Sequence, residues 1–211
     1  MLEIIHGVVV KNPIIGSPQF CLLTEEYGKI PVIAFKHHQR TRMGLGNFVQ
    51  SVVLHDQHNS FIVQSVELLA QPTLNYKNLG WFHHLLEISY FFCPMHQPAS
   101  EVYTTLQTSL KLLLIEISER EAIQLSLIGH LLILFGFYPP PHFAEALNSI
   151  KPLLAMTIDF QAPQNLQLLK QSAAMLQEQD LSQYHTWLLA CINSHPRISG
   201  FKTLPFVYKS I

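Results

Sequence analysis

FCLLTEEYGKIPVIAF, residues 20–35, is the stretch that decides the fold of the N-terminal part of the chain. Within it, Phe20 to Thr24 and Lys29 to Phe35 are short runs rich in β-branched and aromatic side chains, which favour strands. Glu26-Tyr27-Gly28 lies between them and has the composition of a tight turn. The stretch therefore predicts two strands joined by a hairpin.

Three more runs of this kind lie on either side of the hairpin. They span Leu2 to Val10, Phe48 to His55 and Phe61 to Leu69, and residues typical of turns separate them. Five strands suffice to close a small barrel of the oligonucleotide-binding (OB) type. Periodicity alone leaves an SH3-like barrel open as the alternative.

The remainder of the chain has the apolar periodicity of helices. Gln71-Pro72-Thr73 ends the β region, Asn75 to Asn78 has the character of a linker, and Gly136 is placed to cap a helix. The predicted helices are Leu79 to Phe92, one capped by Ser100 and reaching Ile117, one from Ile123 to Leu134, and shorter ones at Phe143 to Ser149, Asn165 to Gln177 and Gln183 to Asn193. We expect an α+β chain, with a five-stranded OB-type β-barrel domain at 1–74 and an all-α antiparallel helical bundle at 75–211.

Composition limits the possible functions. The chain has 211 residues, 48% hydrophobic and only 13% charged, with a formal net charge of -1, so any contact with nucleic acid must be local. Cys21, Cys93 and Cys191 are far apart and lack metal-knuckle spacing, which indicates a reduced cytoplasmic protein. No signal peptide is evident, and the longest apolar stretch, Leu125 to Tyr138, is too short to span a membrane. We expect no membrane association.

A basic, glycine-punctuated segment, KHHQRTRMGLG at residues 36–46, lies between two predicted strands. As a loop it can spread its cationic side chains toward successive phosphates of a nucleic acid, and such contacts give affinity that is independent of sequence. The alternative is a solvated loop without a ligand. The predicted phosphate-binding residues are Lys36, His37, His38, Arg40 and Arg42, with Lys11 and Lys29 at strand ends as weaker additions on the same face.

Aromatic side chains in the barrel region offer surfaces on which bases can stack. The four candidates are Phe20, Tyr27, Phe35 and Phe48, although alternating aromatic residues in strands more often belong to a barrel core. Tyr27 is the favoured one, because turns are exposed. We therefore include it among the predicted DNA-binding residues.

No motif indicates an enzyme. A phosphate-binding glycine-rich loop, a GxSxG elbow and an HExxH pair are all missing from the sequence, and its carboxylates form no close pairs. His83 and Glu87 lie one helical turn apart, a spacing that can support a metal, but no third ligand follows. His130 falls on an apolar helical stripe and is expected to be a hydrogen-bonded core residue, and Cys21 is expected to be an inert strand residue. We expect no catalytic residue, metal or cofactor.

Four landmarks occur in an order that resembles the RecO family of bacterial recombination mediators. The first is GVVV at 7–10 leading to CLLTEEYGKI at 21–30, and the second is AFK at 34–36 leading to RTR at 40–42. The third is the helix that ends in LFGFYP before residue 140, and the fourth is His195 followed by Lys202-Thr203. The resemblance implies an N-terminal OB barrel, a helical C-terminal domain, and a role in strand annealing and recombinase loading.

The resemblance also implies partner proteins, and this sequence differs from the family pattern at some positions. The family's helical domain receives the acidic C-terminal tail of single-stranded DNA-binding protein, and RecR also engages the protein. Candidates for meeting the acidic tail are Lys111, Arg120 and Lys202. Many members carry zinc-binding cysteines after the third landmark, but Phe137 to Met156 contains none, so this chain is expected to lack zinc. Leu204 stands where the family has an arginine.

The sequence thus predicts a non-catalytic DNA repair and recombination mediator, cytoplasmic and associated with the nucleoid. It would bind single- and double-stranded DNA through the barrel and would dock single-stranded DNA-binding protein and RecR through the helices. Two alternatives stay open. One is a protein-interaction adaptor whose barrel has lost DNA affinity, and the other is an RNA-binding OB-fold protein.

Overall fold

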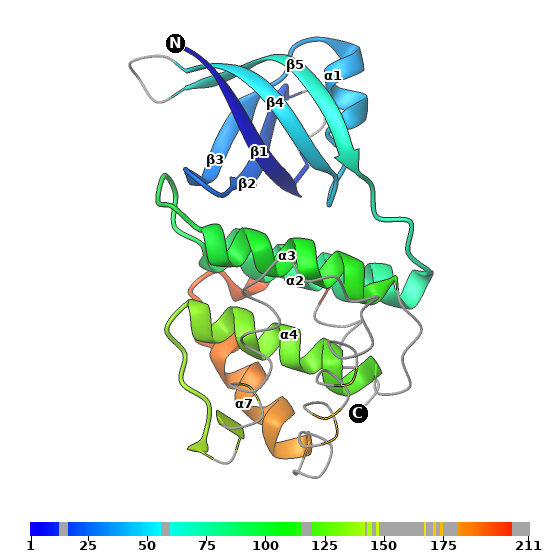
Figure 1. Ribbon diagram of the computed structural model, residues 1–211. Helices are drawn as coiled ribbons and strands as arrows, with labels where there is room; N and C mark the ends of the chain where they lie inside the picture. Colours follow the sequence, from blue (N-terminus) through cyan, green and yellow to red (C-terminus); the bar gives the residue numbers. More distant parts are fainter. Residues whose placement is uncertain are drawn as a thin grey trace.

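A computed structural model describes residues 1–12, 17–55, 60–114, 120–141 and 181–203, together with single positions at 143, 144, 147, 167, 171 and 174. Figure 1 shows a barrel of strands on one side of two helices, α2 and α3, and two more helices, α4 and α7, on their other side. The predicted α+β layout, strands first and helices after, is confirmed.

Five strands form the closed barrel, in the order β1-β2-β3-β5-β4. All neighbours pair antiparallel except β3 and β5, which pair parallel through Val32 with Phe61 and Ile33 with Ile62. The five strand predictions are confirmed, with ends shifted by at most two residues. The strands are β1 (Leu2–Lys11), β2 (Gln19–Thr24), β3 (Gly28–Ile33), β4 (Phe48–His55) and β5 (Phe61–Ala70).

The barrel buries apolar side chains on both of its faces. Inward-facing residues such as Ile5, Val9 and Val53 form its interior core. Because side chains alternate along a strand, Val8 and Phe48 point outward instead, and they pack against α2 and α3 in a second core that the helices share. This shared core fixes one side of the barrel against the helical layer.

The described helices are α1 (His37–Arg42), α2 (Tyr76–Phe92), α3 (Ser100–Leu113), α4 (Arg120–Leu134) and α7 (Leu181–Asn193), followed by a short 3-10 turn at Ile198–Gly200. The linker predicted at Asn75 to Asn78 is wrong. Asn75 is the N-cap of α2, and its side chain accepts a hydrogen bond from the backbone N–H of Asn78 at 2.9 Å. Similarly, the cap of α3 is Ala99, and Ser100 is the first helical residue.

Gly136 ends the helix before it, as predicted. Its φ of +89° is reached readily only by glycine. The N–H of Gly136 donates to the carbonyl of Ile133, and the N–H of Phe137 donates to the carbonyl of Leu132. These bonds satisfy carbonyls that the end of α4 would otherwise leave without partners.

The later helices are described only in part. The predicted helix at Gln183 to Asn193 is confirmed as α7. The predictions at Phe143 to Ser149 and Asn165 to Gln177 fall mostly outside the described residues. Among the helices described, none is long and apolar enough to cross a membrane.

The segment at residues 93–99 fastens the helical layer to the barrel. The N–H of His96 donates to the carbonyl of Lys29, and the N–H of Ala99 donates to the carbonyl of Glu25. Lys29 and Met95 also form an isolated parallel bridge. The chain passes from β5 to α2 between Ala70 and Tyr76, but the division into two domains there stays a prediction, because one apolar core runs across both parts.

Candidate nucleic-acid interface

The basic segment is a short helix, so the predicted loop is wrong. Helix α1 has six residues, and the carbonyl of Lys36 accepts from the N–H groups of Gln39 and Arg40. Gln39, only 1% exposed, holds this turn in place. Its side-chain oxygen accepts from the N–H of Lys36, and its amide nitrogen donates to the carbonyls of Val63 and Gln64 in β5. The cations therefore lie on a fixed turn against β5.

All five predicted phosphate-binding residues around α1 are exposed. They are Lys36, His37, His38, Arg40 and Arg42. No acidic residue occurs in the sequence between Glu26 and Asp56, so this segment of the chain has a net positive charge of its own. Within the described part of the chain, the only ion pair joins His55 and Glu3. The α1 surface, defined as these five residues, thus has no carboxylate partner among the described residues.

Two arginines of the α1 surface are oriented by the barrel backbone. Nε of Arg40 donates to the carbonyl of Ala34 at 3.0 Å, and Nη1 of Arg42 donates to the carbonyl of Val66 at 2.5 Å. A guanidinium group has five N–H donors, so each arginine keeps others for a phosphate. These bonds hold the side chains in place without neutralising them.

Lys29 and Lys11 were predicted to lie on the same face as the basic segment. In the structure both contact α2. Lys29 is 8% exposed, and its ammonium donates to the carbonyl of Tyr90. Burial lowers the pKa of Lys29. The ammonium of exposed Lys11 donates to the Tyr90 hydroxyl at 2.8 Å and lies 4.5 Å from the centre of the ring. Both lysines help to fasten the barrel to α2.

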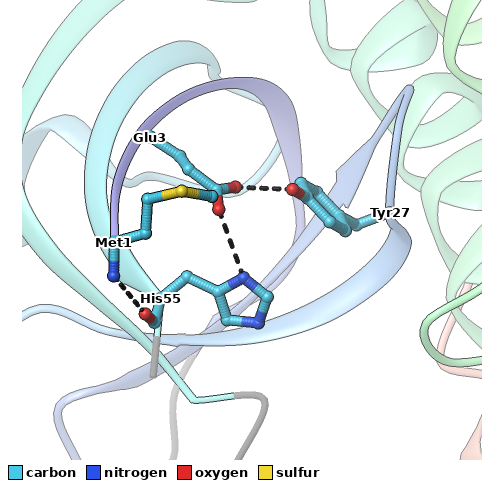
Figure 2. Close-up of polar contacts among 4 residues, drawn as sticks. All are labelled: Met1, Glu3, Tyr27 and His55. Atoms are coloured by element: carbon cyan, nitrogen blue, oxygen red, sulfur yellow. Dashed lines mark hydrogen bonds and ion pairs between the residues drawn. The ribbon is translucent and has the colours of Figure 1, made fainter. Parts of the chain in front are cut away.

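Tyr27 is also not free to stack on a base, although its turn was expected to expose it. Figure 2 shows its hydroxyl donating to Glu3, which also bonds the His55 ring at 3.4 Å. The Tyr27 ring packs on Phe61 at 5.3 Å and on His55 at 5.9 Å between centroids. The backbone amine of Met1 donates to the His55 carbonyl and completes the cluster. Tyr27 therefore belongs to a packed cluster at one end of the barrel.

The other aromatic candidates separate clearly by exposure. Phe20 and Phe48 are 5% and 2% exposed and belong to the cores, whereas Phe35 is 60% exposed. Phe35 directly precedes the α1 surface. Sequence reasoning favoured Tyr27 over Phe35, although the place of Phe35 at the end of a predicted strand, next to Lys36 and His37, was a signal that could have identified it.

The Glu3 cluster predicts a measurable pH dependence. The hydrogen bond from Tyr27, and then the contact with His55, lower the pKa of Glu3 below its ordinary 4.5. A lowered carboxyl pKa contributes stability above the unfolded value, and that stability is lost as the pH falls through the folded value. We expect Glu3→Gln to flatten the dependence of unfolding free energy on pH below about pH 5. Urea unfolding of the wild type and of Glu3→Gln at several pH values measures this dependence.

The pH profile of the unfolding free energy must be compared between wild type and variant, because a second group also lowers stability as the pH falls. Burial lowers the pKa of His84 to about 3, so acid also destabilises the fold through this histidine. Identical pH profiles for wild type and Glu3→Gln would show that the Glu3 cluster does not form in solution.

Glu87, which the sequence paired with His83 as a possible metal site, has a structural role instead. Both carboxylate oxygens of Glu87 accept from the N–H of Lys202, and one also accepts from the N–H and hydroxyl of Thr203. The Thr203 hydroxyl also lies 2.7 Å from Nδ1 of His84. The described residues contain no group of three or more side chains that could hold a metal ion.

The remaining predicted residues lie at separate places. Lys111 and Lys202 are exposed, while the side chain of Arg120, the first residue of α4, lies outside the described part. His130 is buried, as expected, and Cys21 lies in β2, where burial raises the pKa of its thiol to about 12. Such a thiol is a poor nucleophile at neutral pH.

No protein-family model matches the sequence, and no curated protein matches it either. Function is therefore inferred from the geometry described above and from the order of the sequence landmarks.

Proposed function

We propose that the protein is a DNA-binding recombination mediator of the RecO type, with an OB-type barrel that holds DNA at the α1 surface. The closed five-stranded order and the helix between β3 and β4 support the OB assignment over an SH3-like barrel. The landmark order along the chain supports the RecO assignment.

The exposed α1 surface, which forms no ion pair with a carboxylate of the described residues, is the observation that carries the proposal. Its three cations, Lys36, Arg40 and Arg42, and its two histidines lie close together on a turn braced by Gln39, and both guanidinium groups are held by backbone carbonyls. Such a surface meets phosphates without reading bases, and this suits a protein that must handle any sequence. The low overall charge of -1 does not oppose the proposal, because the contact is local.

The proposed mechanism is an exchange of occupancy without catalysis. The helical part holds the acidic tail of single-stranded DNA-binding protein, with Lys111, Arg120 and Lys202 as candidate contacts, and RecR as a further partner. The barrel meanwhile binds the DNA strand that single-stranded DNA-binding protein covers. Complementary strands can then pair, or a recombinase can load, in a cytoplasmic setting close to the nucleoid.

An annealing assay tests this proposal. Two complementary oligonucleotides carry a donor and an acceptor dye, and each is first covered with a bacterial single-stranded DNA-binding protein. We expect the chain to accelerate energy transfer without any nucleotide cofactor. The matched control uses a binding protein without its acidic tail, and the acceleration should then be lost.

The adaptor alternative has one observation in its favour. Lys11 and Lys29, which could have enlarged the cationic surface, are both engaged by Tyr90. If the chain binds the acidic tail peptide but neither accelerates annealing nor binds DNA at low salt, the adaptor replaces the mediator. Tighter binding to RNA than to DNA of the same sequence would favour the RNA-binding alternative instead.

A further inference from the structure

We propose that Phe35 stacks on a base beside the α1 surface, which makes this surface selective for single-stranded DNA. The inference rests on the proposed function and adds the form of nucleic acid that is bound. It begins from the exposure of Phe35: 60% of this residue is accessible, whereas Phe20 and Phe48 are almost completely buried.

The backbone around Phe35 is anchored on both sides. On one side, Ala34 donates its N–H to the carbonyl of Pro18 at 2.9 Å and accepts from Nε of Arg40 at 3.0 Å. On the other side, the N–H of Lys36 donates to the side chain of Gln39 at 3.1 Å. The exposed ring is thus carried by a fixed segment. A prepositioned aromatic residue loses less conformational freedom on binding than one on a loose loop.

The residues next to Phe35 carry charged groups that can bind the phosphate backbone of a nucleic acid. Lys36 follows it directly, and Arg40 bonds the carbonyl of the residue before it. An aromatic platform next to cations is the combination that single-strand binding surfaces use, since the cations track phosphates while bases stack on the ring.

Stacking distinguishes single strands from duplexes. The faces of paired bases are covered by their neighbours in a duplex, so an exposed ring can stack only on a base that is already unstacked. Phosphate contacts alone would instead favour the duplex, whose charge density is higher. A preference for single-stranded over double-stranded DNA would therefore come from stacking on the Phe35 ring and not from the phosphate contacts.

The test measures fluorescence anisotropy with a labelled single-stranded oligonucleotide and with its duplex, using the full chain. We expect Phe35→Ala to weaken single-strand binding by roughly 5- to 150-fold, the range for loss of one stacked base. Duplex binding and the salt dependence should stay nearly unchanged. Phe35→Trp should retain single-strand binding, whereas Phe35→Leu should lose it, because leucine keeps apolar character but has no aromatic face.

Tyr138→Ala is the matched control, since Tyr138 is an exposed aromatic residue, 87% accessible, after the end of α4. It should bind both DNA forms as the wild type does. If Phe35→Ala binds single strands as well as the wild type, the stacking role is wrong while DNA binding stands. If the wild type binds no DNA in either form, the proposed function and this inference both fail.

Discussion

Replacing Arg40 and Arg42 together by glutamine should weaken binding to both single- and double-stranded DNA by about 100-fold or more at low salt. Hydrogen bonds to a charged group contribute about 1.5–3 kcal/mol each, which corresponds to at least tenfold for each arginine. The loss should be similar for different sequences, because phosphates carry no sequence information. Fluorescence anisotropy with oligonucleotides of several sequences measures both effects.

Two comparisons separate lost contacts from lost structure. Lys77→Gln with Arg197→Gln removes the same charge from exposed positions in the helical part and should leave affinity almost unchanged. Because Arg40 and Arg42 also bond the barrel backbone, a second variant alters Lys36, His37 and His38 to glutamine and spares those two bonds. If both α1 variants bind like the wild type while the folded content is intact, the α1 surface is not the DNA site.

Gly28→Ala should destabilise the folded chain by about 3 kcal/mol or more. Gly28 has a φ of +61°, which is costly for alanine, and an added Cβ would lie 1.7 Å from the carbonyl oxygen of Gln97. The segment at 93–99 would have to leave the barrel, and its hydrogen bonds to Lys29 and Glu25 would be lost. For a chain of this size the melting temperature should fall by about 6–12 °C.

Gly80→Ala is the matched control for this prediction. Gly80 lies inside α2, and no atom would come within 4 Å of an added Cβ. Alanine is a better helix former than glycine, so this variant should gain about 0.5–1 kcal/mol. Differential scanning calorimetry of the two variants and the wild type measures both shifts. Equal melting temperatures for Gly28→Ala and the wild type would show that the barrel and the 93–99 segment do not meet as described.

The strands were predictable because their signals are local. Runs of branched and aromatic residues mark them, and turn residues such as Gly46 separate them. Helix α1 was not predictable in this way, because its six residues are too few for a periodic pattern and Gln39 holds them through carbonyls of β5. A tertiary contact of this kind has no signature in the basic run itself.

The candidate site could be predicted only in part, for the same physical reason. Alternation along β3 places Lys29 on the outer face, and the sequence gives no sign that the 93–99 segment and Tyr90 cover that face. Tyr27 was assigned to an exposed turn, but its hydroxyl donates a hydrogen bond to Glu3, which is distant in the sequence, and this bond holds the ring at the end of the barrel. The exposed basic residues around α1 were predicted correctly, because a run of basic residues in the sequence itself indicates an exposed surface.

The salt dependence of DNA affinity tests the central claim most directly, which is that the α1 surface binds phosphates. A plot of log Kd against log salt concentration should be linear, and its slope should correspond to the release of about two to four counterions. The Arg40 and Arg42 double variant should lower that number by about two. Affinity that does not change with salt, or no detectable binding at low salt, would contradict the claim.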